Sequence, residues 1–90
     1  MFRFNVHIYC ILSRKGWHFS CNFDDINHLL LFFKHHVPLC IDYPSKTRLY
    51  RVYDSYDNKY TFFMVTFNKY HNNKIVIIDR DVAEDYINGL

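Results

Sequence analysis

The first quarter of the chain alternates between apolar and polar residues with a period of two. From Phe2 to Leu12 every second residue is apolar, and the same alternation returns from Trp17 to Phe23. This period is typical of β-strands that bury one face. Residues 13–16 contain Gly16 and suit a hairpin connection, so the two segments are expected to pair as an antiparallel hairpin.

The register of this hairpin is predicted by matching its apolar faces. If Leu12 lies opposite Trp17, every apolar residue of one strand meets an apolar residue of the other, whereas a slip of one position breaks the match throughout. The expected pairs are then Leu12 with Trp17, Cys10 with Phe19, Ile8 with Cys21 and Val6 with Phe23.

After the hairpin, the apolar period changes to that of an α-helix. Apolar residues recur at helical spacing from position 26 to position 37, which predicts an amphipathic helix over residues 25–36. Asp24 or Asp25 is expected to cap its start, because an Asp side chain accepts from the unpaired N–H groups of the first turn. Pro38 ends the helix, since the residue before a proline is driven out of the helical region.

Further strands and a second helix are predicted in the remaining half of the chain. The strands fall at 39–43, 47–54, 59–70 and 74–79, with a turn over residues 55–58. Residues 75–78 are apolar on both faces, which indicates a central strand or one covered on both sides. A closing helix is expected to be capped by Asp81 and to end at Gly89.

These elements predict an α+β fold in a single domain over residues 1–90. The expected sheet is mainly antiparallel with about five strands in the order β-β-α-β-β-β-α, because hairpin follows hairpin along the chain. One long helix would pack on a face, and a short helix would close the chain.

Composition narrows the class of protein without identifying a function. The 90 residues are 50% hydrophobic and 20% aromatic, which is a folding composition. The length excludes a two-domain enzyme and a repeat array. The formal net charge is only +2, lower than is usual for a dedicated nucleic-acid-binding domain. The middle of the chain is basic and the last twelve residues are acidic.

The cysteines indicate a reducing compartment. Cys10, Cys21 and Cys40 are odd in number and lack the Cys-x-x-Cys spacing, so no disulfide framework is expected. The longest apolar run, Leu29 to Phe33, is too short to span a membrane. Polar residues interrupt the apolar N-terminal stretch, so no signal peptide is expected. The cytoplasm is therefore the expected location, with no contact with a membrane.

No residue pattern indicates catalysis or a cofactor. The strongest local cluster of metal ligands or nucleophiles is His35, His36 and Cys40, but adjacent histidines on a helix diverge by about 100°. Whether this cluster binds a metal is left open. Gly16 and Gly89 are the only glycines, so a phosphate-binding glycine loop cannot be built. We expect a protein that is not an enzyme.

The remaining constellation interleaves aromatic and basic residues in the third quarter of the chain. Tyrosine and arginine are enriched at protein interfaces, which favours a contact surface for a protein partner. Rings and cations on a sheet face also suit RNA or single-stranded nucleic acid, which is the alternative. The residues expected to share one solvent-facing surface are Arg48, Tyr50, Arg51, Tyr53, Tyr56 and Lys59.

A hypothesis about biological role follows from composition alone. Residues with A/T-rich codons, such as Phe, Tyr, Asn, Ile and Lys, are abundant, and the chain has a single alanine. Together with the small size, this favours an accessory protein of a phage or mobile element that inhibits a host factor, such as a defence complex, in the host cytoplasm. A homodimer formed through an edge strand is a further expectation.

Overall fold

A computed structural model describes residues 2–9, 16–36 and 46–89 of the chain. Along these residues lie β1 (Phe4–Tyr9), β2 (Trp17–Phe23), α1 (Ile26–His35), β3 (Thr47–Asp54), β4 (Lys59–Thr66), β5 (Lys74–Ile78) and α2 (Arg80–Asn88). The strand expected at 39–43 falls outside the described residues. The α+β class, with a five-stranded antiparallel sheet and two helices, is confirmed.

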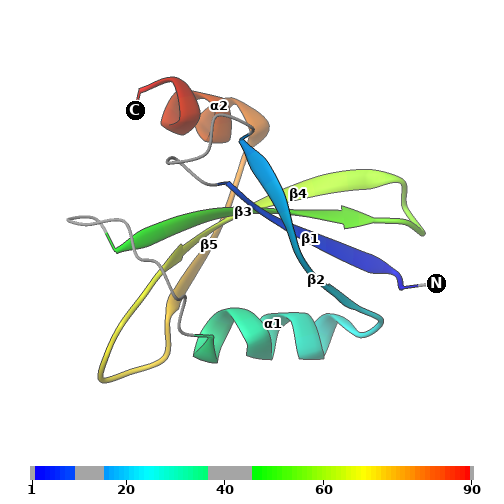
Figure 1. The fold of residues 1–90 in the computed structure, drawn as a ribbon, viewed down its shortest axis with the longest axis horizontal. Coiled ribbons are helices and arrows are strands. Elements are labelled where there is room, and N and C mark those ends of the chain that lie inside the picture. Colours follow the sequence, from blue (N-terminus) through cyan, green and yellow to red (C-terminus); the bar gives the residue numbers. More distant parts are fainter. Residues whose placement is uncertain (1, 10–15, 37–45, 90) are drawn as a thin grey trace.

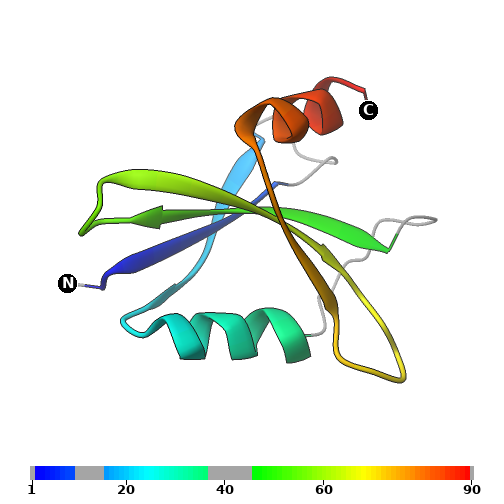
Figure 2. The same ribbon diagram turned by 180° about the vertical axis from the view of Figure 1, so that it is seen from behind.

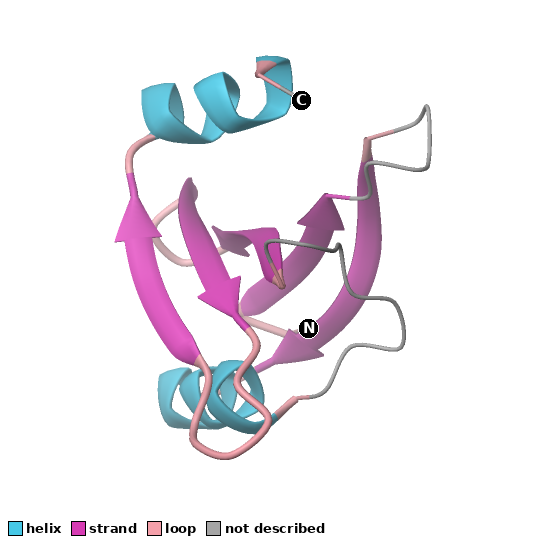
Figure 3. Ribbon diagram, turned by 90° about the vertical axis from the view of Figure 1, so that its left-hand side faces the viewer, coloured by secondary structure: helices cyan, strands magenta, loops and turns pink. Residues whose placement is uncertain are grey.

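The sheet has the order β2-β1-β3-β4-β5, and each neighbouring pair is antiparallel. The two helices lie on opposite sides of this twisted sheet (Figures 1 and 2). Figure 3 shows α2 following directly from the end of β5. The expected contrast between a long and a short helix is wrong, because α1 has 10 residues and α2 has 9.

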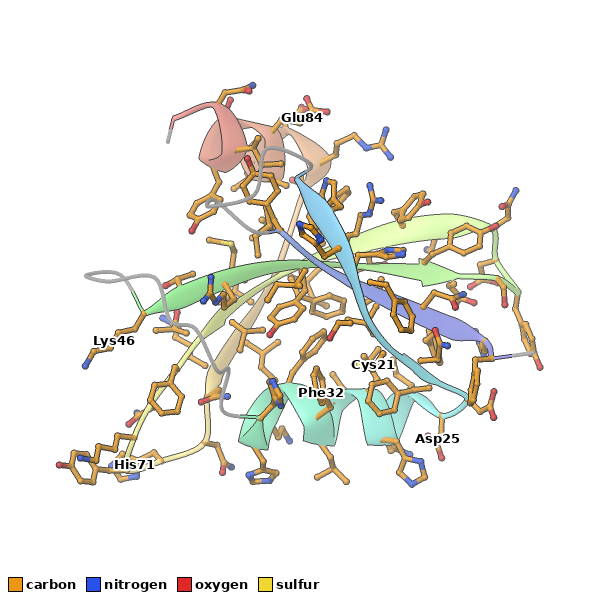
Figure 4. The ribbon with its side chains drawn as sticks, viewed as in Figure 1. Cys21, Asp25, Phe32, Lys46, His71 and Glu84 are labelled. Carbon is orange, nitrogen blue, oxygen red and sulfur yellow. The ribbon has the colours of Figure 1, made fainter. Side chains whose placement is uncertain are left out.

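The core lies between the sheet and α1. Leu29 and Phe33 of α1 are fully buried against strand residues that alternate with period two. Figure 4 shows Cys21 and Phe32 within this layer. The buried residues of the cluster are Phe4, Val6, Leu29, Phe33, Tyr50, Val52, Phe63 and Val65.

A side chain caps the N-terminus of helix α1. Asp25 occupies the N-cap position, and its carboxylate accepts from the backbone N–H of Asn27 at 2.7 Å, as expected for one of the two candidate caps.

Helix α2 differs from expectation because it begins at Arg80 with Asp79 at the N-cap position, so Asp81 lies inside the first turn. There the carboxylate still faces the positive end of the helix dipole.

The predicted register of the first hairpin is wrong. Val6 pairs with Cys21 rather than with Phe23, so the strands are shifted by two residues. The register also slips beside Val6, because His7 pairs with Phe19 and Ser20 forms a β-bulge. A bulge reverses which face the following side chains occupy, and a uniform alternation along the strand does not reveal it.

The position predicted for the fifth strand is also wrong. β5 is an edge strand, not a central one, and it is not covered on both faces. The side chain of Val76 is 42% exposed and that of Ile77 is 68% exposed. An apolar run alone does not distinguish a central strand from an uncovered edge.

Neither described helix is long and apolar enough to cross a membrane.

Candidate functional site

The six predicted contact residues do not share one surface. Arg48 and Tyr50 are buried, at 5% and 3% exposure, on the side of β3 that faces α1. The expectation that they are exposed is wrong, because they have the same parity along β3 as the core residue Val52. Burial raises the pKa of Tyr50 to about 12, which keeps its phenol protonated.

The other four predicted residues remain accessible, but in two places. Arg51 and Tyr53 have the opposite parity along β3 and lie on the sheet face turned away from α1, which we call the open face. Tyr56, in the β3–β4 turn, is 76% exposed, and Lys59 is exposed at the start of β4. Contact with a partner through these four residues stays a prediction.

Arg51 is the centre of the open face. Its guanidinium carbon lies 4.6 Å from the centroid of the Trp17 ring and 5.1 Å from that of Tyr60. Its Nε donates to Nδ1 of His7 at 3.4 Å. Burial, and then the charge of Arg51, lower the pKa of His7, so the imidazole is neutral at pH 7 and can accept this hydrogen bond.

Aromatic rings from four strands surround Arg51. The Tyr9 and Trp17 centroids are 5.6 Å apart, and those of Tyr53 and Tyr60 are 5.0 Å apart. Such pairs, with offset or edge contacts, hold rings in defined positions. We define the open-face cluster as His7, Tyr9, Trp17, Arg51, Tyr53, Tyr60 and Phe62.

The β-bulge in β2 brings Trp17 into this cluster. Ahead of the bulge, Trp17 pairs with Tyr9 and Phe19 pairs with His7, so both side chains lie on the open face, where Phe19 is 63% exposed. Sequence reasoning placed both in the core and therefore missed them as site residues. The only signal available in the sequence was the excess of large apolar residues over what one small core can hold.

A groove separates the open-face cluster from α2. Its volume is about 310 Å³. Figure 4 shows Glu84 on α2, on the side of the sheet away from α1. The guanidinium of Arg80 lies 5.8 Å from the centroid of the Phe62 ring. The groove is lined by Trp17, Arg51, Phe62, Arg80, Ala83, Glu84 and Ile87.

Helix α2 is acidic as a whole, but the charged residues that it contributes to the groove are one cation, Arg80, and one carboxylate, Glu84. Asp79 precedes α2, and Asp81, Glu84 and Asp85 lie on it against the single cation Arg80. The groove therefore joins an aromatic floor that contains Arg51 to a helical wall that contains Arg80 and Glu84. A surface of this kind offers a partner two cations and a carboxylate, along with apolar contact area.

A second hollow lies on the other side of the sheet, beside the first turn of α1. Its volume is about 330 Å³, and its lining is mainly apolar, including the exposed Ile26 and Ile77. The only charged side chains among its lining residues are Arg3 and Asp54, which bind each other in a two-point ion pair. Because this cation is already neutralised, the hollow lacks a free charge that could orient a ligand.

The groups considered for chemistry do not form a site within the described residues. Burial raises the pKa of the Cys21 thiol, so it is not a thiolate at neutral pH. His35 and His36 are exposed at the end of α1, and Cys40 lies outside the described residues. Across the part of the chain that the structure describes, no three His, Cys, Asp or Glu side chains gather in a metal-binding arrangement.

Comparison with known proteins adds no assignment. No protein-family model matches the chain, and no curated protein or solved structure is significantly similar to it. The functional argument therefore depends on the geometry of the open-face cluster.

Proposed function

We propose that this is a non-catalytic binding protein that recognises another protein through the open-face cluster. The supporting observation is Arg51, a guanidinium held between the rings of Trp17 and Tyr60 on a sheet face that is only partly covered. Tryptophan, tyrosine and arginine dominate the binding energy of protein interfaces. Because ring contacts already restrict Arg51, a partner would immobilise it at a small additional cost in entropy.

The charge around the cluster favours a protein partner over a nucleic acid. A polyanion would meet Arg51 and Arg80 but would also approach the carboxylates of α2, among which Glu84 lines the same groove. Repulsion between these carboxylates and phosphates would weaken binding. RNA or single-stranded nucleic acid stacked on the rings is the alternative.

The proposed biological role is inhibition of a host protein or protein complex. The chain would be an accessory protein of a phage or mobile element, acting in the host cytoplasm against a factor such as a defence complex. Its small size and A/T-rich residue usage support this role. Inhibition without catalysis requires only a surface that occupies a site on the target.

The test is affinity capture of a host protein, followed by binding measurements with variants. Capture from host lysate with and without nuclease, read by mass spectrometry, identifies the partner for a titration with purified components. We expect Arg51→Ala and Tyr60→Ala each to weaken binding about 30-fold, the effect of losing about 2 kcal/mol at an interface hot spot. The matched control is Tyr70→Ala, because Tyr70 is 80% exposed in the β4–β5 loop, outside the cluster.

The outcomes separate the two functions. Binding that survives nuclease and is lost in the Arg51 and Tyr60 variants, but not in the Tyr70 variant, supports protein recognition. Capture that vanishes with nuclease, together with binding of an RNA oligonucleotide that weakens steeply with salt, supports the alternative. Equal binding by all three folded variants would overturn the role of the cluster. Circular dichroism reports whether each variant is folded.

A further inference from the structure

We propose that the outer edge of β5 pairs with β5 of a second copy of this chain, joining two sheets into one continuous antiparallel sheet. β5 ends the strand order, and among the described strands only β4 pairs with it. In an antiparallel ladder, alternate residues direct their N–H and C=O groups toward each side. Every second residue of β5 therefore presents backbone donors and acceptors outward. Figure 3 shows β5, the strand that leads into α2, at the edge of the sheet.

The two edges of the sheet differ in how they are protected. β2, at the other edge, contains the bulge at Ser20, and bulges interrupt further pairing. β5 pairs with β4 over five consecutive residues without a register shift and contains neither proline nor glycine. Natural edge strands usually carry such obstacles, so a regular edge is a candidate for pairing with another strand.

The side chains of β5 suit pairing with an identical strand. Val76 is 42% exposed and Ile77 is 68% exposed, although β-branched residues of this kind favour the interior of a sheet. If two copies pair antiparallel about Val76, Ile75 of each copy lies opposite Ile77 of the other, on the α1 side of both sheets. The four isoleucine side chains then pack against one another across the junction between the two copies.

Charge favours a second copy in the antiparallel direction. β5 begins at the cation Lys74 and is followed directly by Asp79, with Asp81 in the first turn of α2. Antiparallel pairing brings Lys74 of each copy toward the acidic end of the other, whereas parallel pairing would bring like charges together. The two-fold axis is perpendicular to the sheet, so both open-face clusters face the same side.

The expected dimer is weak. Pairing of two five-residue strands buries much less than the roughly 1,200 Å² typical of stable interfaces. We therefore expect a dissociation constant between about 10 µM and about 1 mM. Association should be visible only as the concentration rises through this range.

Sedimentation velocity of the full chain from about 10 µM to about 1 mM tests this proposal. The weight-average sedimentation coefficient of the wild type should rise toward that of a dimer. Val76→Lys should abolish the rise, because two lysines would face each other at the axis. Phe19→Lys is the matched control: Phe19 is 63% exposed on β2, at the opposite edge of the sheet, and this variant should still associate.

A mixing experiment tests the register without depending on a loss of function. Val76→Lys and Val76→Glu should each be monomeric alone but should form a heterodimer when mixed, since opposite charges then meet at the axis. A wild type that stays monomeric to about 1 mM would overturn the proposal. Dissociation caused equally by Phe19→Lys, or a mixture that stays monomeric, would also overturn it. These outcomes are independent of the open-face variants.

Discussion

Asp54 connects Arg3, the residue just before β1, to the β3–β4 turn. Its carboxylate accepts from Arg3 through Nε at 3.0 Å and Nη2 at 3.1 Å, and from the backbone N–H groups of Tyr56 and Asp57. The Arg3 hydrogen bond is the main reason why the pKa of Asp54 is lowered from 3.8 to about 2. The guanidinium of Arg3 in turn lies 4.7 Å from the centroid of the exposed Tyr56 ring.

This pKa predicts how acid affects the stability of the protein. A carboxyl group with a lowered pKa stabilises the folded state above its unfolded pKa, and the contribution is lost as the pH falls through the folded value. Asp54→Asn keeps an oxygen for the two backbone N–H groups but removes the ion pair with Arg3. We expect this variant to be less stable than the wild type at pH 7, and the difference to shrink between pH 3.8 and about 2.

Urea denaturation of both proteins at several pH values measures this difference. A difference that is the same at pH 7 and at pH 2 would contradict the assignment. Asp57→Asn is a suitable control, because its carboxylate lies 3.9 Å from Arg3 and is largely exposed. Exposed pairs of this kind contribute little to stability.

At the scale of elements, Asn73 fastens α1 to the β4–β5 loop. Its side chain is buried, and Nδ2 donates to the carbonyl oxygens of Phe33 and His36 at 2.9 Å each. The carbonyls at the end of a helix lack partners within the helix, so Asn73 satisfies two of them. Its Oδ1 accepts from the backbone N–H of Asn68 at 3.1 Å, which shapes the loop itself.

Asn73→Ala is therefore expected to destabilise the protein by about 1–3 kcal/mol, the cost of leaving buried polar groups unpaired. The matched control is the neighbouring Asn72→Ala, an exposed position where a change within about 0.5 kcal/mol is expected. Chemical denaturation measures both. Equal stability of the two variants would show that the hydrogen bonds of Asn73 do not hold the helix.

At the scale of the whole molecule, a single core on the α1 side carries the fold. The ring of Phe33 lies 5.1 Å from that of Tyr50 and 5.0 Å from that of Phe63, centroid to centroid. It therefore joins the helix to the central strand β3 and to its neighbour β4. On the open face Leu49 is buried, but the residues of the open-face cluster are only half-buried or exposed.

Phe33→Ala should cost about 3–5 kcal/mol, because it removes buried contacts and leaves a cavity in the core. A change of about 1 kcal/mol shifts the melting temperature of a domain of this size by about 4–8 °C, so the variant should melt at least about 12 °C below the wild type. Phe19→Ala is the control, since Phe19 is 63% exposed. Thermal unfolding followed by circular dichroism compares them, and a similar melting temperature for both would contradict the location of the core.

The site was only partly predictable from the sequence, and the reasons are specific. Alternation along β3 separates Arg48 and Tyr50 from Arg51 and Tyr53, so grouping all four overlooked a period visible in the chain itself. Trp17 is different. Its place beside Arg51 depends on the bulge in β2 and on the pairing of β1 with β3, neither of which leaves a local signal.

The sequence by itself determined the approximate positions of the described strands and helices along the chain. β2 and β3 have the predicted bounds and Asp25 caps α1, whereas the strand predicted over residues 59–70 ends at Thr66. The alternation of β2 and the cap of α1 depend on neighbouring residues only. The tertiary structure alone decided that β5 lies at an edge and that Trp17 reaches Arg51. Both depend on hydrogen bonds between strands that are distant in the chain. The order and register of these strands are set by how much apolar surface the complete sheet and its helices bury, which no single segment determines.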